Sequence, residues 1–300
     1  MRYSRKFYDL PDGQMSAVHF GDVAAPPQLV FIHGTGFHGL AYRSLLEPLS
    51  QDSGAHIIAL DLRGHGMTRL PADPDALPNW QPLRDDVLAF LRAYIDAPVV
   101  LAGHSLGAGV SLMAAAQAGD KVRGLAGFDP VTLPLLPRLA LKTRAGRAFA
   151  GKNLSLARNA GKRRADFDSF DAVFERYQGR GAFRDMPDAA LRDYIDGAFV
   201  LREGGGVTLT CRPLWEQATF VAQGQDQFAA ARGAMKNTGG NMQIVYAGKR
   251  SPTRGPQRAK MRRLLGAERV TFHAEKSHFF PLEAPEFSRG ILRSVLRLDA

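Results

Sequence analysis

The chain has 300 residues, of which 45% are hydrophobic and 23% charged, and its formal net charge is +10. This composition indicates a globular protein and excludes a disordered or fibrous one. No apolar run reaches the roughly 20 residues of a membrane-spanning helix, and residues 1–10 lack the apolar core of a secretory signal. With a single cysteine, Cys211, no intrachain disulfide can form. We therefore expect a cytoplasmic protein.

The positive charge is concentrated in one segment. Residues 131–165 contain no Asp or Glu and nine cationic side chains, which are Arg138, Lys142, Arg144, Arg147, Lys152, Arg158, Lys162, Arg163 and Arg164. Such a run most often forms a solvated helix face, and the alternatives are attraction of an anionic substrate and contact with an anionic membrane surface. No zinc-ligand spacing, aromatic RNA-binding stretch or helix-turn-helix pattern accompanies the charge, so we expect no nucleic-acid partner.

Apolar runs bounded by Gly, Pro and Asp alternate with helical patterns over the first 130 residues. They predict strands at residues 15–20, 28–33, 56–61, 99–102 and 122–128, with helices at 42–49, 83–95 and 106–118. Two more strands, at 241–247 and 269–273, and a helix at 285–298 follow. The alternation predicts an α/β fold whose mostly parallel, twisted sheet has helices on both faces.

The alternation fails between residues 131 and 240, where polar, helical stretches such as 166–177 and 188–201 carry few strand signals. We therefore expect three parts. Residues 1–130 form the N-terminal part of the core, residues 131–240 an inserted helical cap, and residues 241–300 the C-terminal part of the core. Open parallel sheets bind ligands at the carboxyl edge of their strands, so an insertion above that edge would cover the site.

One motif, Gly103-His104-Ser105-Leu106-Gly107, carries most of the chemical information. It has the form G-x-S-x-G and joins the strand at 99–102 to the helix at 106–118. In such a turn the serine hydroxyl is exposed at the helix N-terminus, and the glycines let strand and helix approach closely. This context makes Ser105 a candidate nucleophile.

A serine hydroxyl is a weak nucleophile at neutral pH, so a base must accept its proton, and imidazole has a suitable pKa. Among the eight histidines, His278 is the best candidate, because it follows the last predicted strand in a loop that can reach Ser105. His104 and His33 are expected to be scaffold residues, since their positions are fixed by neighbouring motifs.

These motifs, taken in order, resemble the α/β-hydrolase fold superfamily, and in particular its serine-nucleophile members with a helical cap. His33-Gly34-Thr35-Gly36 resembles the family's oxyanion loop, residues 61–66 its D-x-R-G-x-G turn, and residues 277–285 its late histidine loop. The resemblance implies Ser105 as nucleophile and His278 as base. It also implies an oxyanion hole made by the backbone N–H of Leu106 and that of Thr35 or Gly36.

The acid of the triad is where the chain departs from the family's usual pattern. In most members it follows the strand equivalent to residues 243–247, and here Ser251 occupies that position. A serine cannot stabilise an imidazolium by charge. The other acid position used in this fold lies one strand earlier, where the chain has Asp129, and we expect Asp129 to orient His278. Asp226 and Glu275 are weaker candidates.

Two further charged residues, Asp61 and Arg63, are expected to fix their turn through a charge pair.

We expect a serine hydrolase that cleaves a carboxylic ester or thioester through an acyl-enzyme intermediate. Its substrate would be a small ester or acyl compound, with or without a negative charge, and the reaction needs no cofactor or metal. The alternatives are a C–C bond hydrolase with the same triad and a catalytically weakened binding protein, which the absence of a carboxylate near His278 would favour.

Overall fold

The structure, a computed structural model, describes residues 3–298, so residues 1, 2, 299 and 300 of the predicted core lie outside the described residues. Its main sheet consists of β1 (Tyr3–Leu10), β2 (Gly13–Phe20), β3 (Pro27–Ile32), β4 (His56–Leu60), β5 (Val99–His104), β6 (Val122–Phe128), β10 (Met242–Lys249) and β11 (Val270–Ser277). Across the sheet their order is β1-β2-β4-β3-β5-β6-β10-β11. The pairs β1–β2 and β2–β4 are antiparallel, and the other neighbours are parallel.

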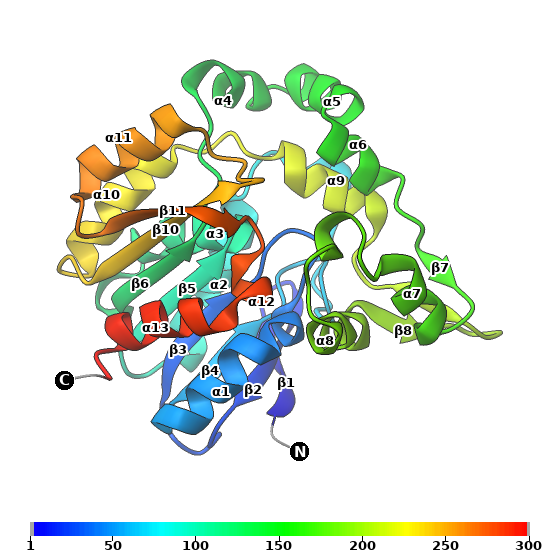
Figure 1. Cartoon of the computed structure of the whole chain (residues 1–300), viewed down its shortest axis with the longest axis horizontal. Helices are drawn as coiled ribbons and strands as arrows, with labels where there is room; N and C mark the ends of the chain where they lie inside the picture. The colour runs from blue at the N-terminus through cyan, green and yellow to red at the C-terminus, as the bar shows by residue number, and fades with distance from the viewer. Residues whose placement is uncertain (1–2, 299–300) are drawn as a thin grey trace.

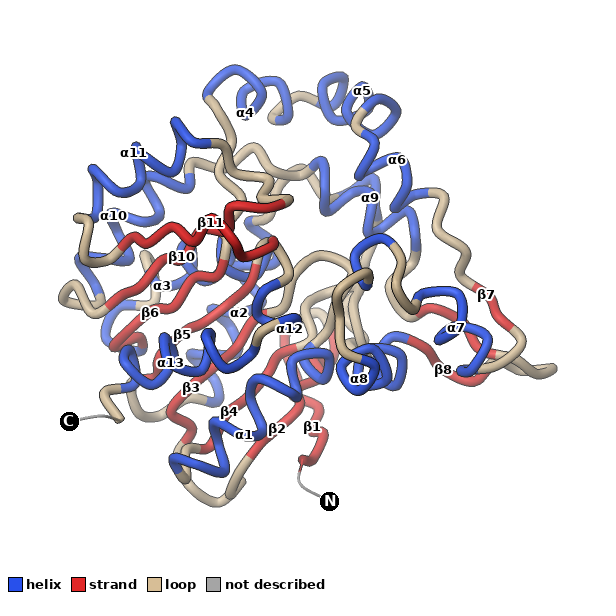
Figure 2. The backbone as a smooth tube through the Cα atoms, in the orientation of Figure 1, coloured by secondary structure: helices blue, strands red, loops and turns tan. Residues whose placement is uncertain are grey.

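Helices cover both faces of this sheet (Figures 1 and 2). One face carries α1 (Arg43–Ser53), α12 (Phe280–Glu283) and α13 (Pro285–Leu296), and the other carries α2 (Gln81–Tyr94), α3 (Leu106–Ala115), α10 (Gln227–Asn237) and α11 (Gly255–Leu265). Short 3₁₀ helices lie in the connections at η1 (Gly39–Tyr42), η2 (Pro74–Ala76) and η3 (Gly119–Lys121). The predicted α/β architecture is confirmed.

Alternate residues of the central strands supply two separate hydrophobic cores. In β3, Val30 and Ile32 pack into the core on the α2–α3 side, whereas Leu29 and Phe31 pack into the core on the α1–α13 side. This is the two-residue period of a strand that is buried on both faces. Burial of each such side chain contributes about 1.5–3 kcal/mol, so the sheet centre is the most stable part of the fold.

Between β6 and β10 the chain forms a second layer, which we call the cap and define as α4 to α9. Its helices are α4 (Leu135–Leu141), α5 (Arg144–Asn153), α6 (Ser155–Gly161), α7 (Phe170–Tyr177), η4 (Gly181–Phe183), α8 (Asp188–Ala198) and α9 (Pro213–Val221). A small antiparallel sheet joins β7 (Asp166–Phe167), β9 (Val207–Leu209) and β8 (Phe199–Leu201). In Figure 1 the cap runs along the top and right of the main sheet.

Several elements differ from the sequence-based expectation. Strand β1 was not expected, because its alternation of exposed residues such as Ser4 and Lys6 with half-buried ones such as Tyr3 and Arg5 is that of a sheet edge. The stretch at 188–201, predicted as helical throughout, ends as strand β8. Helix α10 falls inside the predicted insertion 131–240, yet it packs on α3 and adds Phe228 to the core. We propose that the core resumes at α10.

No helix within residues 3–298 is long and apolar enough to cross a membrane.

The junction of β5 and α3 depends on two glycines. A Cβ atom added to Gly107 would lie 2.1 Å from the backbone oxygen of Ile32, and one added to Gly103 would lie 2.4 Å from the carbonyl carbon of Gly107. Both distances are far below van der Waals contact, and the atoms involved are backbone atoms. Only glycine therefore allows α3 to begin this close to β3 and β5.

The substitution Gly107→Ala is expected to lower the free energy of unfolding by about 3 kcal/mol, because its methyl group overlaps a backbone oxygen that cannot rotate away. The matched control is Gly290→Ala in α13, where no atom lies within 4 Å of the added methyl group. It should raise the free energy of unfolding by about 1 kcal/mol, since Ala favours a helix over Gly. Urea unfolding measures both values. A Gly107→Ala variant as stable as the parent chain would contradict the close packing.

Candidate active site

Three strands of the main sheet end at the residues singled out from the sequence. Ser105 lies between β5 and α3, Asp129 directly follows β6, and His278 follows β11 just before α12. Since β5, β6, β10 and β11 are neighbouring parallel strands, their carboxyl ends meet at one edge of the sheet. The structure thus brings together residues that lie up to 173 positions apart in the chain.

The three side chains form a continuous line of hydrogen bonds. His278 Nε2 lies 3.1 Å from Ser105 Oγ, and His278 Nδ1 lies 2.6 Å from Asp129 Oδ2. Ser105 has φ 55° and ψ −115°, and Asp129 has φ 46°, a region that non-glycine residues rarely adopt. Such backbone conformations cost about 1–3 kcal/mol each and persist only where the surrounding packing imposes them. The arrangement can pass a proton from the serine hydroxyl to the imidazole.

The second carboxylate oxygen of Asp129 is also fully engaged. Asp129 Oδ1 accepts a hydrogen bond of 2.8 Å from the Ser251 hydroxyl and one of 3.2 Å from the Ala247 N–H. The side chain of Asp129 is completely buried, so these donors replace the water that it would otherwise bind. Ser251, which occupies the family's usual acid position, therefore contacts Asp129 and supports the carboxylate there.

The two weaker acid candidates lie elsewhere. Asp226 caps the N-terminus of α10 and forms an ion pair of 2.7 Å with Arg138. Glu275 pairs with Lys249 at 2.7 Å on the surface, where its side chain is 85% exposed. Of the carboxylates weighed from the sequence, Asp129 alone forms a hydrogen bond with His278 in the described part of the chain.

His104 has a supporting position beside the site. The Gly34 N–H donates to the Tyr42 hydroxyl at 3.1 Å, so the single hydroxyl proton of Tyr42 is directed to His104 Nδ1 at 2.7 Å. His104 Nε2–H then donates to the backbone oxygen of His278 at 2.8 Å. Burial lowers the pKa of His104 well below its usual value, which keeps the ring neutral. No sequence motif marks Tyr42, although it links the loop at Gly34 to His278 through this network.

The loop after β3 presents backbone donors next to Ser105. The Phe37 N–H donates to the Gly34 oxygen at 3.1 Å, and Gly36 has φ 75°, which together define a tight turn. The turn hydrogen bond leaves the N–H groups of Thr35 and Gly36 unused. The N–H of Leu106, at the first position of α3, has no intrahelical acceptor. Gly34, Thr35, Gly36 and Ser105 line one cavity, and Leu106 directly follows Ser105.

That cavity has a volume of about 790 Å³ and lies between the carboxyl edge of the sheet and the cap. Aromatic side chains from both layers form much of its wall, and they are Phe37, Trp80, Phe167, Tyr177, Phe183, Phe220 and Phe279. A second cavity of about 690 Å³, beneath α4 and α5, shares Phe220, Gln223 and Pro252 with the first. These three residues therefore form part of the wall of both cavities.

The turn at residues 61–66 is held by charge pairs, but not by the expected one. Asp61 is fully buried and pairs with Arg5 at 2.5 Å, and it accepts the N–H groups of Gly39 and Met67. Arg63 pairs instead with Asp86 at 2.7 Å. The prediction that Asp61 and Arg63 pair with each other is wrong, because the edge strand β1 and helix α2 supply closer partners.

Within residues 3–298, no three His, Cys, Asp or Glu side chains are grouped so as to hold a metal ion. The groups beside Ser105 are backbone N–H donors, one imidazole and, behind the imidazole, one buried carboxylate that accepts hydrogen bonds. The N–H donors suit the stabilisation of negative charge on a carbonyl oxygen.

A sequence profile of the Alpha/beta hydrolase family matches residues 29–288. The chain belongs to this family. Both the suspected family and the assignment as an α/β-hydrolase enzyme are therefore confirmed.

Individual relatives of this hydrolase are distant. The 2-(acetamidomethylene)succinate hydrolase of Mesorhizobium japonicum is 28% identical over 65% of this chain and 61% of that protein. The pimeloyl-[acyl-carrier protein] methyl ester esterase of Xanthomonas oryzae pv. oryzae is 37% identical over 36% of this chain and 39% of the relative. This hydrolase therefore spans less than two thirds of the length of either relative.

Solved structures show the same fold over nearly the whole hydrolase. A crystal structure of E-2-(acetamidomethylene)succinate hydrolase matches with a TM-score of 0.80 and 22% identity, covering 99% of this chain and 100% of the other. A thioesterase domain from the curacin biosynthetic pathway matches with a TM-score of 0.75 and 15% identity, covering 97% and 99%. At such identities the likeness concerns the fold, with its inserted helical region.

The buried histidines outside the triad predict how stability depends on pH. Burial lowers the pKa of His33 and His38 to about 4, and that of His19 and His65 to about 3. In the unfolded chain their pKa lies near the usual value of about 6.5. Between the folded and unfolded pKa values the unfolded state therefore binds more protons, so the free energy of unfolding decreases as the pH is lowered. Burial raises the pKa of Asp193 to about 6 and also raises the pKa of Asp86 and that of Asp196, so these carboxyls act in the opposite direction, but they are fewer than the buried histidines.

We therefore expect the free energy of unfolding to fall by on the order of 5 kcal/mol between about pH 7 and about pH 5. Urea unfolding at a series of pH values measures this change. A free energy of unfolding that is constant or rises over this interval would show that these imidazoles are accessible to protons in the folded state.

Proposed function

We propose that this hydrolase cleaves a carboxylic ester or thioester bond through an acyl-enzyme intermediate on Ser105. The proposal rests on the line of hydrogen bonds from Asp129 through His278 to Ser105, which ends at a large cavity under the cap. The order and chemistry of these groups suit nucleophilic attack by a hydroxyl on a carbonyl carbon.

In the first half of the reaction, Ser105 Oγ attacks the carbonyl carbon while His278 Nε2 accepts the hydroxyl proton. Asp129 stays ionised, holds the imidazole by its Nδ1–H and stabilises the imidazolium that forms. The negative charge on the tetrahedral oxygen is bound by the N–H of Leu106 and that of Thr35 or Gly36. Each such donor lowers the barrier by about 3 kcal/mol. His278 then protonates the leaving alcohol or thiol as the bond to carbon breaks.

In the second half, a water molecule attacks the acyl carbon and gives its proton to His278. The same donors bind the second oxyanion. When the bond to Ser105 Oγ breaks, the proton returns to the serine and the carboxylic acid leaves. The enzyme ends in its starting state, so the two halves together consume one ester or thioester and one water.

Two relatives support this class of reaction. The Xanthomonas protein is named as a methyl ester esterase, and the Mesorhizobium protein is named as a hydrolase of 2-(acetamidomethylene)succinate. The alternative of a catalytically weakened binding protein depended on the lack of a carboxylate near His278. The distance of 2.6 Å between His278 Nδ1 and Asp129 Oδ2 removes that support.

A fluorophosphonate probe is expected to label Ser105 in the folded protein, because the probe reacts with serines that an adjacent base activates. Mass spectrometry of the labelled peptide identifies the site. Labelling should be lost in Ser105→Ala and strongly reduced in His278→Ala, whereas Ser111→Ala, which removes a buried hydroxyl of α3, should still be labelled. Absence of labelling at Ser105 in folded protein would refute the proposed nucleophile.

The acid is tested by Asp129→Asn, which should lower kcat for a 4-nitrophenyl ester by about 10³- to 10⁴-fold, since the imidazolium loses its charge partner. Ser251→Ala should lower kcat about tenfold, because Asp129 keeps its charge but loses one hydrogen-bond donor. Ser251→Thr retains a hydroxyl and serves as the matched control. If Asp129→Asn kept most of the activity, another carboxylate would have to orient His278.

A further inference from the structure

The cavity above Ser105 is lined by an excess of positive charge. Six cationic side chains contribute to its wall, and they are Lys162, Arg163, Arg164, Arg176, Arg180 and Arg250. Glu216 is the one carboxylate among the side chains that line the cavity in the described part of the chain. The excess of cations over carboxylates along this wall is proportionally larger than the excess in the chain as a whole.

Two of these cations are neutralised within the fold. Arg163 pairs with Glu216 at 3.0 Å and donates to the hydroxyls of Tyr177 and Tyr194, so its charge is used in holding the cap together. Arg250 pairs with Asp185 and Glu283. Neither guanidinium needs a ligand to balance its charge.

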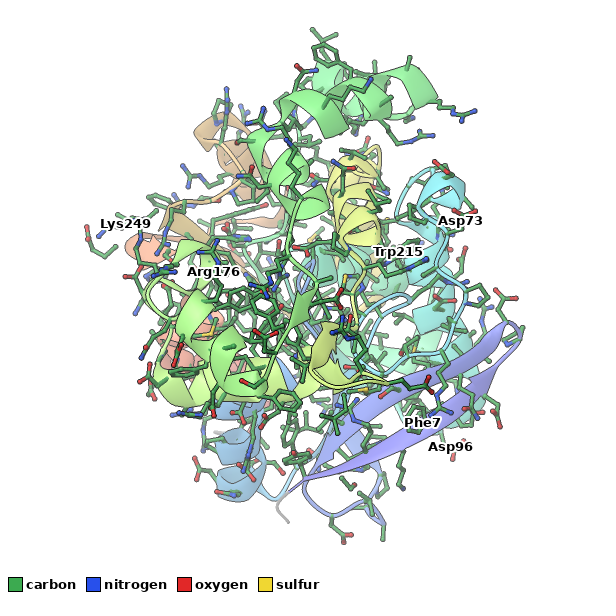
Figure 3. All side chains as sticks on the ribbon, turned by 90° about the vertical axis from the view of Figure 1, so that its right-hand side faces the viewer. Phe7, Asp73, Asp96, Arg176, Trp215 and Lys249 are labelled. Atoms are coloured by element: carbon green, nitrogen blue, oxygen red, sulfur yellow. The ribbon has the colours of Figure 1, made fainter. Side chains whose placement is uncertain are left out.

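The other four, Lys162, Arg164, Arg176 and Arg180, form no ion pair with a carboxylate among residues 3–298. Arg164 donates to the backbone oxygen of Asp166, and Arg180 Nη1 lies 3.5 Å from the backbone oxygen of Arg176. These contacts orient the side chains without cancelling their charge. Figure 3 shows Arg176 on the cap, between Lys249 and Trp215 in that view.

The four cations come from separate cap segments that converge on one opening. Lys162 and Arg164 lie in the link from α6 to β7, Arg176 lies in the last turn of α7, and Arg180 directly precedes η4. Side chains of like charge gathered at one cavity repel each other, and a cavity with low-dielectric walls concentrates their field. All four residues are exposed to solvent, yet they come from three different segments and line the same cavity as Ser105.

We infer that the substrate of this site is an ester or thioester that also carries an anionic group, a carboxylate or a phosphate, which Lys162, Arg164, Arg176 and Arg180 bind. The inference rests on the proposed function and adds the charge of the substrate. Guanidinium groups suit this task, since they pair with carboxylate and phosphate oxygens through two parallel hydrogen bonds. The anion balances the charge at the cavity while the ester carbonyl reaches Ser105.

The experiment compares matched esters that differ in charge. The monoester of adipic acid with 4-nitrophenol and the 4-nitrophenyl ester of hexanoic acid differ only by a terminal carboxylate on the acyl side. 4-Acetoxybenzoate and 4-acetoxybenzamide make the same comparison on the side of the leaving group. The ratio of kcat/KM for the anionic to the neutral ester should exceed about tenfold in at least one pair, and it should fall as salt screens the charges.

The double variant Arg176→Gln/Arg180→Gln should lower that ratio by about tenfold, because it removes two of the four charges. Lys152→Gln is the control, since Lys152 is a cation of the cap that lines neither cavity. It should leave the ratio unchanged. If both variants lowered the ratio equally, net charge and not the cavity would be responsible, and the inference would be overturned.

Binding to Ser105→Ala, measured by calorimetry, separates this inference from the proposed function. Tighter binding of the adipate monoester than of the hexanoate ester, lost in the triple variant with Arg176→Gln and Arg180→Gln, supports the anionic subsite even if the parent chain hydrolyses neither ester. Hydrolysis and Ser105 labelling with ratios near one in both pairs, at low and high salt, would overturn the subsite and leave the serine hydrolase intact.

Discussion

The buried carboxylate of Asp129 is the group on which the rest of the site depends. An ionised carboxylate without partners costs several kcal/mol in the interior, so each of its oxygens must be met by donors. Those donors come from β10 at Ala247, from the following loop at Ser251 and from the loop after β11 at His278. One charge thus ties the end of β6 to both C-terminal strands, and the proposed base can point at Ser105 only while that arrangement holds.

The central strands could be predicted because they are apolar, bounded by turn residues and regularly spaced, and Ser105 and His278 lie in motifs with a distinct local pattern. Edge strand β1 and the three short strands of the cap could not be predicted, since charged strands and strands of two to three residues show no clear hydrophobic periodicity. The pair of Arg5 with Asp61 and the contact of Tyr42 with His104 join positions 56 and 62 residues apart. Only the folded chain reveals such partners, and the same holds for the cations that converge on the cavity.

The space under the cap combines charge and apolar surface. Lys162, Arg176 and Arg180 line the cavity that contains Ser105, whereas the second cavity is walled largely by apolar residues of α4 and α5 and shares Phe220 with the first. The cap therefore borders two chemically different environments, and cap residues contribute to the walls of both.

Because the carboxylate lies at the end of β6, the loop after β10 provides a hydroxyl, that of Ser251, where an acid would otherwise stand. Arg250, next to Ser251, reaches across to Asp185 in the cap and to Glu283 in the histidine loop. Cap and triad are consequently joined by adjacent residues of one short segment. Arg250 and Ser251 thus place the contacts that join the cap to the histidine loop directly beside the hydroxyl that binds Asp129.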